Sequence, residues 1–295
     1  MNGGRTSCGI FLSALLWALP VLSWADGALS NKTCLECHAD AELRTERNGH
    51  AVSLYTDPTV FANSAHADIA CILCHVDIVG VPHTKNLVKG GAQSPLYRTN
   101  IPALCGKCHP DIAKIYAESI HGKALLEGVE DVPVCTDCHG AHAIASSTDP
   151  VSKVAPKNIP KTCGVCHEEA RLAEKYGLPT RRFSTYLDSY HGVANRYGET
   201  TVANCATCHG VHDIRPSSDP MSSIHASNLG KTCGTCHPGA AANLAGLKIH
   251  VEAENSKGIY WVRQFYTYFT GLLVVGFLIH ITVDIIGFLR RRRLT

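Results

Sequence analysis

The sequence predicts a mostly irregular chain with short α-helices, little β-structure and one C-terminal transmembrane helix. Three observations support this fold class. The motif C-x-x-C-H occurs seven times, no sustained apolar period of 2 or 3.6 residues runs through the main part of the chain, and 26 residues near the C-terminus are almost wholly apolar. Each motif has only about 33 residues around it, which is too few to build a conventional hydrophobic core.

The N-terminal segment, residues 1–25, has the pattern of a secretory signal peptide. Arg5 precedes an apolar run, and small residues lead to a cleavage position after Ala25. This segment contains Cys8, the one cysteine of 15 that lies outside a C-x-x-C-H motif. We therefore expect residues 26–258 to form an exported domain in which every cysteine belongs to a motif.

The C-x-x-C-H spacing is the attachment signature of c-type haem. Two thiols bond to the porphyrin vinyl groups, and the adjacent histidine binds the iron. Zinc ribbons and disulfide scaffolds also use paired cysteines, but neither requires a histidine after every second cysteine. The sequence therefore predicts seven covalent haems, attached through Cys34, Cys37, Cys71, Cys74, Cys105, Cys108, Cys135, Cys138, Cys163, Cys166, Cys205, Cys208, Cys233 and Cys236. The motif histidines are His38, His75, His109, His139, His167, His209 and His237.

An internal repeat of 70 residues organises this domain. The stretch SIHGKALLEGVEDVPVCTDCHGAHAI from Ser119 matches SYHGVANRYGETTVANCATCHGVHDI from Ser189, and a looser copy begins at Ser64. Each unit holds a leading motif, a Ser-x-His, a trailing motif and a late histidine. The units start near residues 34, 105 and 163, and a half unit starts at 233.

The repeat supplies one further histidine for each motif. We expect these spare histidines to be second axial ligands: His66, His83, His121, His142, His191, His212 and His250. Methionine, the common alternative ligand, is almost absent, since Met1 leaves with the signal peptide and Met221 stands alone. His50 and His225 have no counterpart in the repeat and are interpreted as surface residues. The spacing leaves open which spare histidine serves which haem.

We expect residues 26–258 to be wrapped around the seven haems, with short helices near residues 110–119 and 168–176. This region carries 21 Lys and Arg against 24 Asp and Glu, so it offers no basic face for nucleic acid. Two ligands on every iron would leave no catalytic site open to a substrate.

Residues 259–289 are predicted to span the membrane once. About 20 apolar residues suffice for a spanning helix, and four arginines, Arg290–Arg293, follow in the tail 290–295. The positive-inside rule places this tail in the cytoplasm and the haem domain in the periplasm, anchored to the inner membrane. His280 and Asp284 share one face of the helix. Either Asp284 pairs with the arginines while His280 packs against a neighbour, or both face a partner helix, where His280 binds a b-type haem or a quinone.

The S-x-H-G and C-x-x-C-H-G-x-H units resemble those of multihaem c-type cytochromes of bacterial anaerobic respiration, including the cytochrome c subunits of menaquinol oxidoreductase complexes. The resemblance covers roughly Thr33 to His250. The stretch FYTYFTGLLVVGFLIHITVDIIGFLRRRR is similar to the first helix of di-haem cytochrome b subunits. The resemblance implies electron transport, with a membrane cytochrome b or quinone oxidoreductase subunit and periplasmic redox proteins as partners.

Three functions remain open from the sequence. The first is an electron-transfer subunit that connects a membrane quinol or quinone partner with periplasmic acceptors. The second is a reductase with one open haem acting on nitrite, hydroxylamine or tetrathionate; the absence of a C-x-x-C-K motif counts against it. The third is a sensor or scaffold, which seven haems disfavour.

Overall fold

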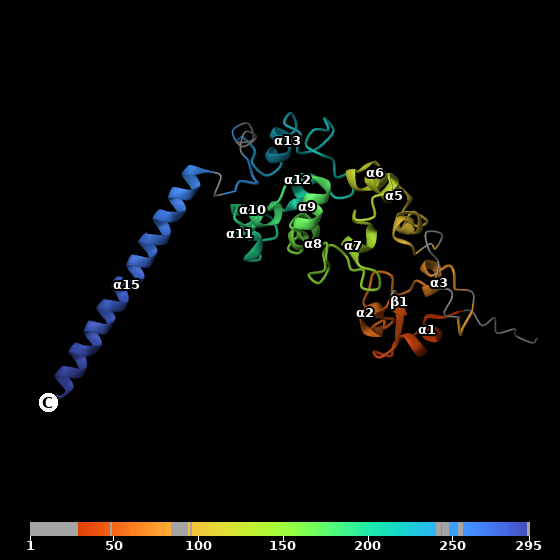
Figure 1. Ribbon diagram of the computed structural model, residues 1–295, viewed down its shortest axis with the longest axis horizontal. Helices are drawn as coiled ribbons and strands as arrows, with labels where there is room; N and C mark the ends of the chain where they lie inside the picture. The colour runs from red at the N-terminus through yellow and green to blue at the C-terminus, as the bar shows by residue number, and fades with distance from the viewer. Residues whose placement is uncertain are drawn as a thin grey trace, which may run out of the picture.

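The computed structural model describes residues 29–47, 49–78, 80–83, 94, 96–239, 243, 248–252 and 256–293. The predicted signal peptide and the last two residues of the tail lie outside these ranges. Figure 1 shows the short helices arranged from α1 and α3 at one end, through α5, α6 and α7, to α8–α13 toward the other, with α15 projecting beyond that end. The predicted mixture of short helices and irregular segments, with little strand, is confirmed in these ranges.

The first repeat unit contains the only sheet in the described part of the chain. Strands β1 (Arg44–Arg47) and β2 (His50–Ser53) form an antiparallel hairpin in which Arg47 pairs with His50. Gly49 lies between them with a φ of 77°, and the Asn-Gly dipeptide at this point in the sequence is favoured in tight hairpin turns. The helices of this unit are α1 (Asn31–His38), α2 (Pro58–Ala62) and α3 (Cys71–Cys74).

The second and third units have closely similar helices. The second consists of η2 (Arg98–Asn100), α4 (Ile101–Cys105), α5 (Pro110–Glu118), α6 (Ile120–Leu126) and α7 (Cys135–His139). The third consists of α8 (Ile159–His167), α9 (Ala170–Tyr176), α10 (Arg182–Leu187), α11 (Tyr190–Arg196) and α12 (Cys205–His209), and α13 (Leu229–Gly234) begins the half unit. The helices expected near residues 110–119 and 168–176 are α5 and α9.

The Ser-x-His-Gly sequence makes a tight corner between two helices. Ser119 donates its hydroxyl proton to the Tyr116 carbonyl at 2.6 Å, and its oxygen accepts from the Gly122 amide at 3.0 Å, which caps α6. Gly122 is in contact with the Tyr116 carbonyl, where a side chain would not fit. The same contacts recur with Ser189, Tyr186 and Gly192. The motif therefore fixes the start of the helix that carries the histidine.

The buried apolar core of the described residues is small. One cluster joins Ile101, Leu125 and Val134, with Cys105, Tyr116, Val132 and Cys135 packed against it. Ser119, Thr185, Asn195 and Asn204 are also buried, so part of the interior is polar and is held by hydrogen bonds. Packing among side chains alone gives this domain little apolar stabilisation.

The long helix α15 (Lys257–Arg293) stands apart from the helices that carry the C-x-x-C-H motifs in Figure 1. It is 37 residues long, or about 55 Å, which exceeds the roughly 30 Å hydrocarbon thickness of a bilayer. Its mean hydropathy reaches 2.4, and no part of its apolar window is buried in the structure. By length and composition α15 is able to cross a membrane, and it includes the predicted span 259–289.

Candidate functional site

The seven C-x-x-C-H motifs occupy two kinds of position on the helices. The leading motif of each unit lies at the C-terminal end of a helix, as in α1, α4, α8 and α13. The trailing motif begins at the first residue of a helix, as in α3, α7 and α12. In both positions the two cysteines and the histidine are held close together on about one helical turn, as joint attachment of one cofactor requires.

Local hydrogen bonds fix the trailing motifs. In α7, Asp137 accepts from the Val134 amide at 2.7 Å and forms an ion pair with Arg98 at 2.8 Å. In α12, Asn204 and Thr207 replace these contacts, because the Asn204 side chain accepts from the Thr207 amide at 3.2 Å. The residues between the cysteines differ between units, yet both sets stabilise the N-terminus of the helix.

Each motif histidine lies beside one spare histidine. Among the described residues there are seven such pairs, with ring centroids 5.9–6.3 Å apart. With the motif histidine first, they are His38–His83, His75–His142, His109–His66, His139–His212, His167–His121, His209–His250 and His237–His191. His66 and His83 of the looser copy, and His250 of the half unit, are paired in the same way as the histidines of the two closely matching copies.

Simple ring stacking also gives centroid distances between 4.5 and 7 Å, so distance alone does not identify a ligand pair. The composition of the pairs distinguishes the two cases. In the part of the chain that the structure describes, no pair joins two motif histidines or two spare histidines, and His50 and His225 belong to none. Chance stacking among histidines has no reason to produce this one-to-one matching.

The separation fits two imidazoles that bind one metal ion from opposite sides. Bonds from a metal to imidazole nitrogen are about 2.0–2.1 Å for zinc, and two such bonds plus the radii of two rings span roughly 6 Å. The described residues contain no group of three or more His, Cys, Asp or Glu side chains suited to hold a metal ion by themselves. Each pair of rings alone offers two ligands, which is the number that a six-coordinate haem iron takes from a protein.

The pairing crosses from one repeat unit to the next. The Ser-x-His histidine pairs with the leading motif of the following unit, as His121 does with His167. The late histidine pairs with the trailing motif of the preceding unit, as His212 does with His139. His83, in the first unit, instead pairs with the leading motif of its own unit. Neighbouring units also share backbone hydrogen bonds, from Ala65 to Ile144 at 2.6 Å and from Ile120 to Ile214 at 2.8 Å.

Two of the paired histidines have a short hydrogen bond at Nδ1. The Nδ1 of His38 lies 2.8 Å from the Leu54 carbonyl oxygen, and the Nδ1 of His250 lies 3.1 Å from the Thr185 hydroxyl. A longer contact of 3.5 Å joins the Nδ1 of His142 to the Thr56 hydroxyl. A carbonyl can only accept, so the Nδ1 of His38 carries the proton and its Nε2 keeps the lone pair that a metal needs.

Burial favours the neutral form of nine of the paired histidines, and neutral imidazole is the form that binds metals. Burial, with a smaller contribution from His167, lowers the pKa of His121 to about 4. Burial, followed by the charge of Arg182, lowers the pKa of His250 to about 4. Burial also lowers the pKa of several others: His75, His139, His142, His167, His191, His209 and His212. Burial thus shifts these imidazoles toward the neutral form, because it disfavours the charged form.

Within a unit, the leading and trailing motifs lie side by side. Asn31 of α1 donates to the Ile69 carbonyl at 3.0 Å and accepts from the Cys71 amide at 2.8 Å, which ties α1 to α3. Helix α4 packs against α7, and α8 packs against α12. The thiols of Cys105 and Cys135 lie near each other, as do those of Cys163 and Cys205.

Successive units also meet through their motifs. Burial raises the pKa of Cys138 to about 11, and the nearby Cys163 of the next motif raises it as well. The pKa of Cys74 is raised by burial and then by Cys105 and Cys108, and that of Cys208 by burial and then by Cys233 and Cys236. Attachment of haem would turn these thiols into thioethers, but the proximity would remain. The seven motifs thus form a linear series in sequence order.

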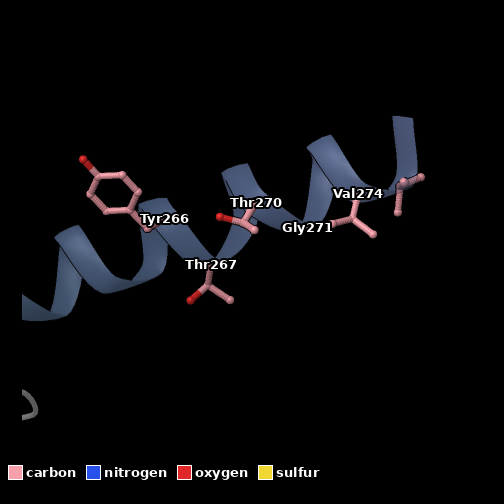
Figure 2. A pocket seen from close by; sticks show the side chains of 6 residues that line it. Tyr266, Thr267, Thr270, Gly271 and Val274 are labelled. Carbon is pink, nitrogen blue, oxygen red and sulfur yellow. The ribbon is translucent and has the colours of Figure 1, made fainter. Parts of the chain in front are cut away.

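On α15, His280 and Asp284 lie together, with 3.7 Å between Nε2 and Oδ2. Nearer the N-terminus of the same helix, a shallow hollow is lined by Tyr266, Thr267, Thr270, Gly271, Val274 and Val275. Figure 2 shows these side chains spread along one stretch of a single helix, without a second element to enclose a ligand.

The sequence did not indicate the contacts of Leu54, Thr56 or Thr185 with the paired histidines, because these residues belong to no motif.

Comparisons with protein-family models, with curated proteins and with solved structures return no match for this chain.

Proposed function

We propose that this chain is a membrane-anchored periplasmic c-type cytochrome with seven haems. It carries electrons between a membrane quinol or quinone oxidoreductase and periplasmic redox proteins in anaerobic respiration. The observation that carries the proposal is the one-to-one pairing of seven motif histidines with seven spare histidines at centroid distances of 5.9–6.3 Å. The sequence holds seven motif histidines and seven spare histidines, and the pairing of one with each of the other supports a common role for both sets.

The paired histidines support electron carriage over catalysis on a substrate. Haem bound at such a pair supplies reversible one-electron exchange at its iron. The chain's own residues bring two imidazoles together at each site and leave no motif histidine without a partner among the seven. A reductase would need one motif with its second axial position open to substrate.

The order of the motifs gives the series two ends. The first motif lies in α1, next to the β1–β2 hairpin, and the seventh begins in α13, before the chain enters α15 (Figure 1). With α15 in the inner membrane and Arg290–Arg293 on the cytoplasmic side, the seventh motif stands near the membrane surface. We infer that the membrane partner exchanges electrons at this end and the periplasmic partner at the first.

The pair of His280 and Asp284 supports a membrane partner. Ionisable side chains in a spanning helix are costly when they face lipid, and here they are 3.7 Å apart on one helix face. A second helix that covers this face would shield both groups, and His280 would then be placed to bind a b-type haem or a quinone. A single helix cannot enclose such a site, so the partner subunit has to complete it.

Two measurements on the detergent-extracted protein test the proposal. A pyridine haemochrome assay should give seven c-type haems per chain, and low-temperature electron paramagnetic resonance of the oxidised protein should show low-spin signals only. A zinc-loaded or haem-free native protein would overturn the assignment. A stoichiometric high-spin component would show one open iron and would favour the reductase.

A further inference from the structure

The buried hydroxyl of Thr185 lies beside a proposed haem ligand at the membrane-facing end of the series. Thr185, on α10, is 4% exposed, and its Oγ1 is 3.1 Å from the Nδ1 of His250. The same oxygen is 2.6 Å from the Arg181 carbonyl and 3.3 Å from the Arg182 carbonyl. His250 follows the last motif and reaches back to pair with His209 of α12.

The direction of these hydrogen bonds follows from the donors available. A threonine hydroxyl has one proton, and the 2.6 Å contact commits that proton to the Arg181 carbonyl, which can only accept. Toward His250 the hydroxyl oxygen must therefore accept, so the Nδ1 of His250 carries a proton. The Nε2 of that ring is then unprotonated and free to bind a metal.

The backbone around α10 is arranged to hold this hydroxyl. Arg181, the residue before the helix, has a φ of 59°, and it is the one residue other than glycine with positive φ in the described ranges. This left-handed conformation is unfavourable in a residue other than glycine, because the Cβ atom crowds the following carbonyl oxygen. The Thr185 hydroxyl bonds to the Arg181 carbonyl, so the contact that stabilises this turn also orients the acceptor for His250.

We propose that Thr185 is a positioning residue that sets the tautomer, ring orientation and donor strength of His250, and thereby lowers the reduction potential of the haem at the sixth motif. This inference rests on the proposed function, because it takes His209 and His250 as the axial ligands of one haem. Hydrogen bonds from ligand imidazoles to acceptors in the surrounding protein fix the tautomer and raise ligand basicity. A more basic ligand favours ferric over ferrous iron.

The repeat makes this feature specific to the third unit. Ile115 stands 70 positions before Thr185 in the second unit, and it has no hydroxyl. In the other units, as far as the structure describes them, the nearest approach of a hydroxyl to a paired histidine is the 3.5 Å contact of Thr56 with His142. We therefore expect the sixth haem to differ in potential from the other haems at trailing motifs for a reason that lies outside its two ligands.

The test is a spectroelectrochemical titration of the intact haem-loaded protein with three variants. Thr185→Val keeps the shape and removes the acceptor, Thr185→Ser restores a hydroxyl, and Ser184→Ala removes a neighbouring hydroxyl that bonds the same Arg181 carbonyl at 3.3 Å. In Thr185→Val, one midpoint potential should rise. At a fixed applied potential the ferric-to-ferrous ratio of that haem should fall by about two- to tenfold, and a tenfold change corresponds to a shift of 59 mV. Thr185→Ser and Ser184→Ala should titrate like the wild type.

The outcomes separate this inference from the proposed function. One shifted potential, together with a changed low-spin resonance signal and a full haem count, supports the role of Thr185. Seven low-spin haems with unchanged potentials in Thr185→Val overturn it and leave the proposed function intact, because the Arg182 carbonyl beside the ring then suffices as acceptor. A shift of equal size in Ser184→Ala also overturns it. Absence of c-type haem from the wild-type protein would remove both.

Discussion

His121 lies with its ring beside that of His167, and burial lowers its pKa to about 4. It is therefore neutral at pH 7, as a metal ligand must be, and the corner made by Ser119 and Gly122 fixes its helix. The same combination of a capped corner and a neutral ring recurs at His191 beside His237. At this scale the site depends on burial and on local backbone geometry more than on charge.

Replacing His121 or His191 with methionine should raise the potential of one haem while the protein stays folded. Thioether sulfur stabilises ferrous iron relative to a second imidazole, so ligation by histidine and methionine raises the potential. Redox titration of His121→Met, read beside His225→Met as a control at an unpaired histidine, measures the change. An identical titration curve for His121→Met and the wild type would contradict the pairing of His121 with a haem.

The depressed pKa values of His121 and His250 predict loss of stability in acid. The ordinary histidine pKa of about 6.5 applies in the unfolded chain, whereas in the folded protein the pKa of both histidines is lowered to about 4. The unfolded state therefore binds more protons below pH 6.5, so stability is full above that pH and falls as the pH drops toward 4. For His121 the full loss is roughly 3 kcal/mol, at about 1.4 kcal/mol for each unit of pKa difference.

Urea unfolding at pH 7.5, 6.5, 5.5 and 4.5 would measure this loss, with His121→Met as the comparison. That variant should show a shallower decline over the same interval, because one of the titrating groups is gone. A free energy of unfolding that stays constant from pH 6.5 to 4.5 would show that these rings are not held neutral in the folded state.

At the scale of single elements, the helical corner of the Ser-x-His-Gly sequence determines where the spare histidine lies. In the third unit, a Cβ on Gly192 would lie 2.7 Å from the Leu187 Cα and in contact with the Tyr186 carbonyl, which are backbone atoms that cannot rotate away. Helices α10 and α11 would have to separate, and His191 would move relative to His237. The ring of His191 is therefore positioned by the glycine that follows it.

Gly192→Ala should destabilise the protein by about 1–3 kcal/mol and convert one haem from low-spin to high-spin, since overpacking forces a backbone shift. Gly230→Ala in α13 is the matched control, because nothing lies within 4 Å of its added Cβ, and helix propensity favours alanine there by roughly 1 kcal/mol. Chemical unfolding and paramagnetic resonance of both variants measure the effect. Equal behaviour of the two variants would mean that the corner does not hold the ligand.

Repetition made much of this arrangement predictable. Two aligned copies of S-x-H-G and C-x-x-C-H-G-x-H separated His121, His142, His191 and His212 from ordinary surface histidines, and the short helices and apolar C-terminal helix also followed from the sequence. The pairing did not follow, because it depends on turns that carry each spare histidine into a neighbouring unit. Thr185 could not be found by repetition, since its counterpart Ile115 differs, and the β1–β2 hairpin lies in the least regular unit.

At the scale of the whole molecule, the seven motifs are ordered as they are in the sequence. Contacts inside units alternate with contacts between units, from Asn31 with Cys71 in the first unit to Cys208 beside Cys233 near the last. Figure 1 shows the units following one another toward α15. Each motif has neighbours only before and after it in the sequence. Loss of the haem at a middle motif should therefore interrupt electron transfer between the first motif and the last.

Removing the fourth motif should isolate the first three haems from the membrane end. In the double variant Cys135→Ala with Cys138→Ala, membranes that contain the partner and receive a quinol should rapidly reduce only the haems of motifs five to seven. The double variant Cys34→Ala with Cys37→Ala removes an end member, and all its remaining haems should be reduced at the wild-type rate. Stopped-flow absorbance of the haem α-band follows both variants, after low-spin signals have shown that the remaining haems are intact. Rapid reduction of every remaining haem in the fourth-motif variant would mean that the series branches or that quinol enters elsewhere.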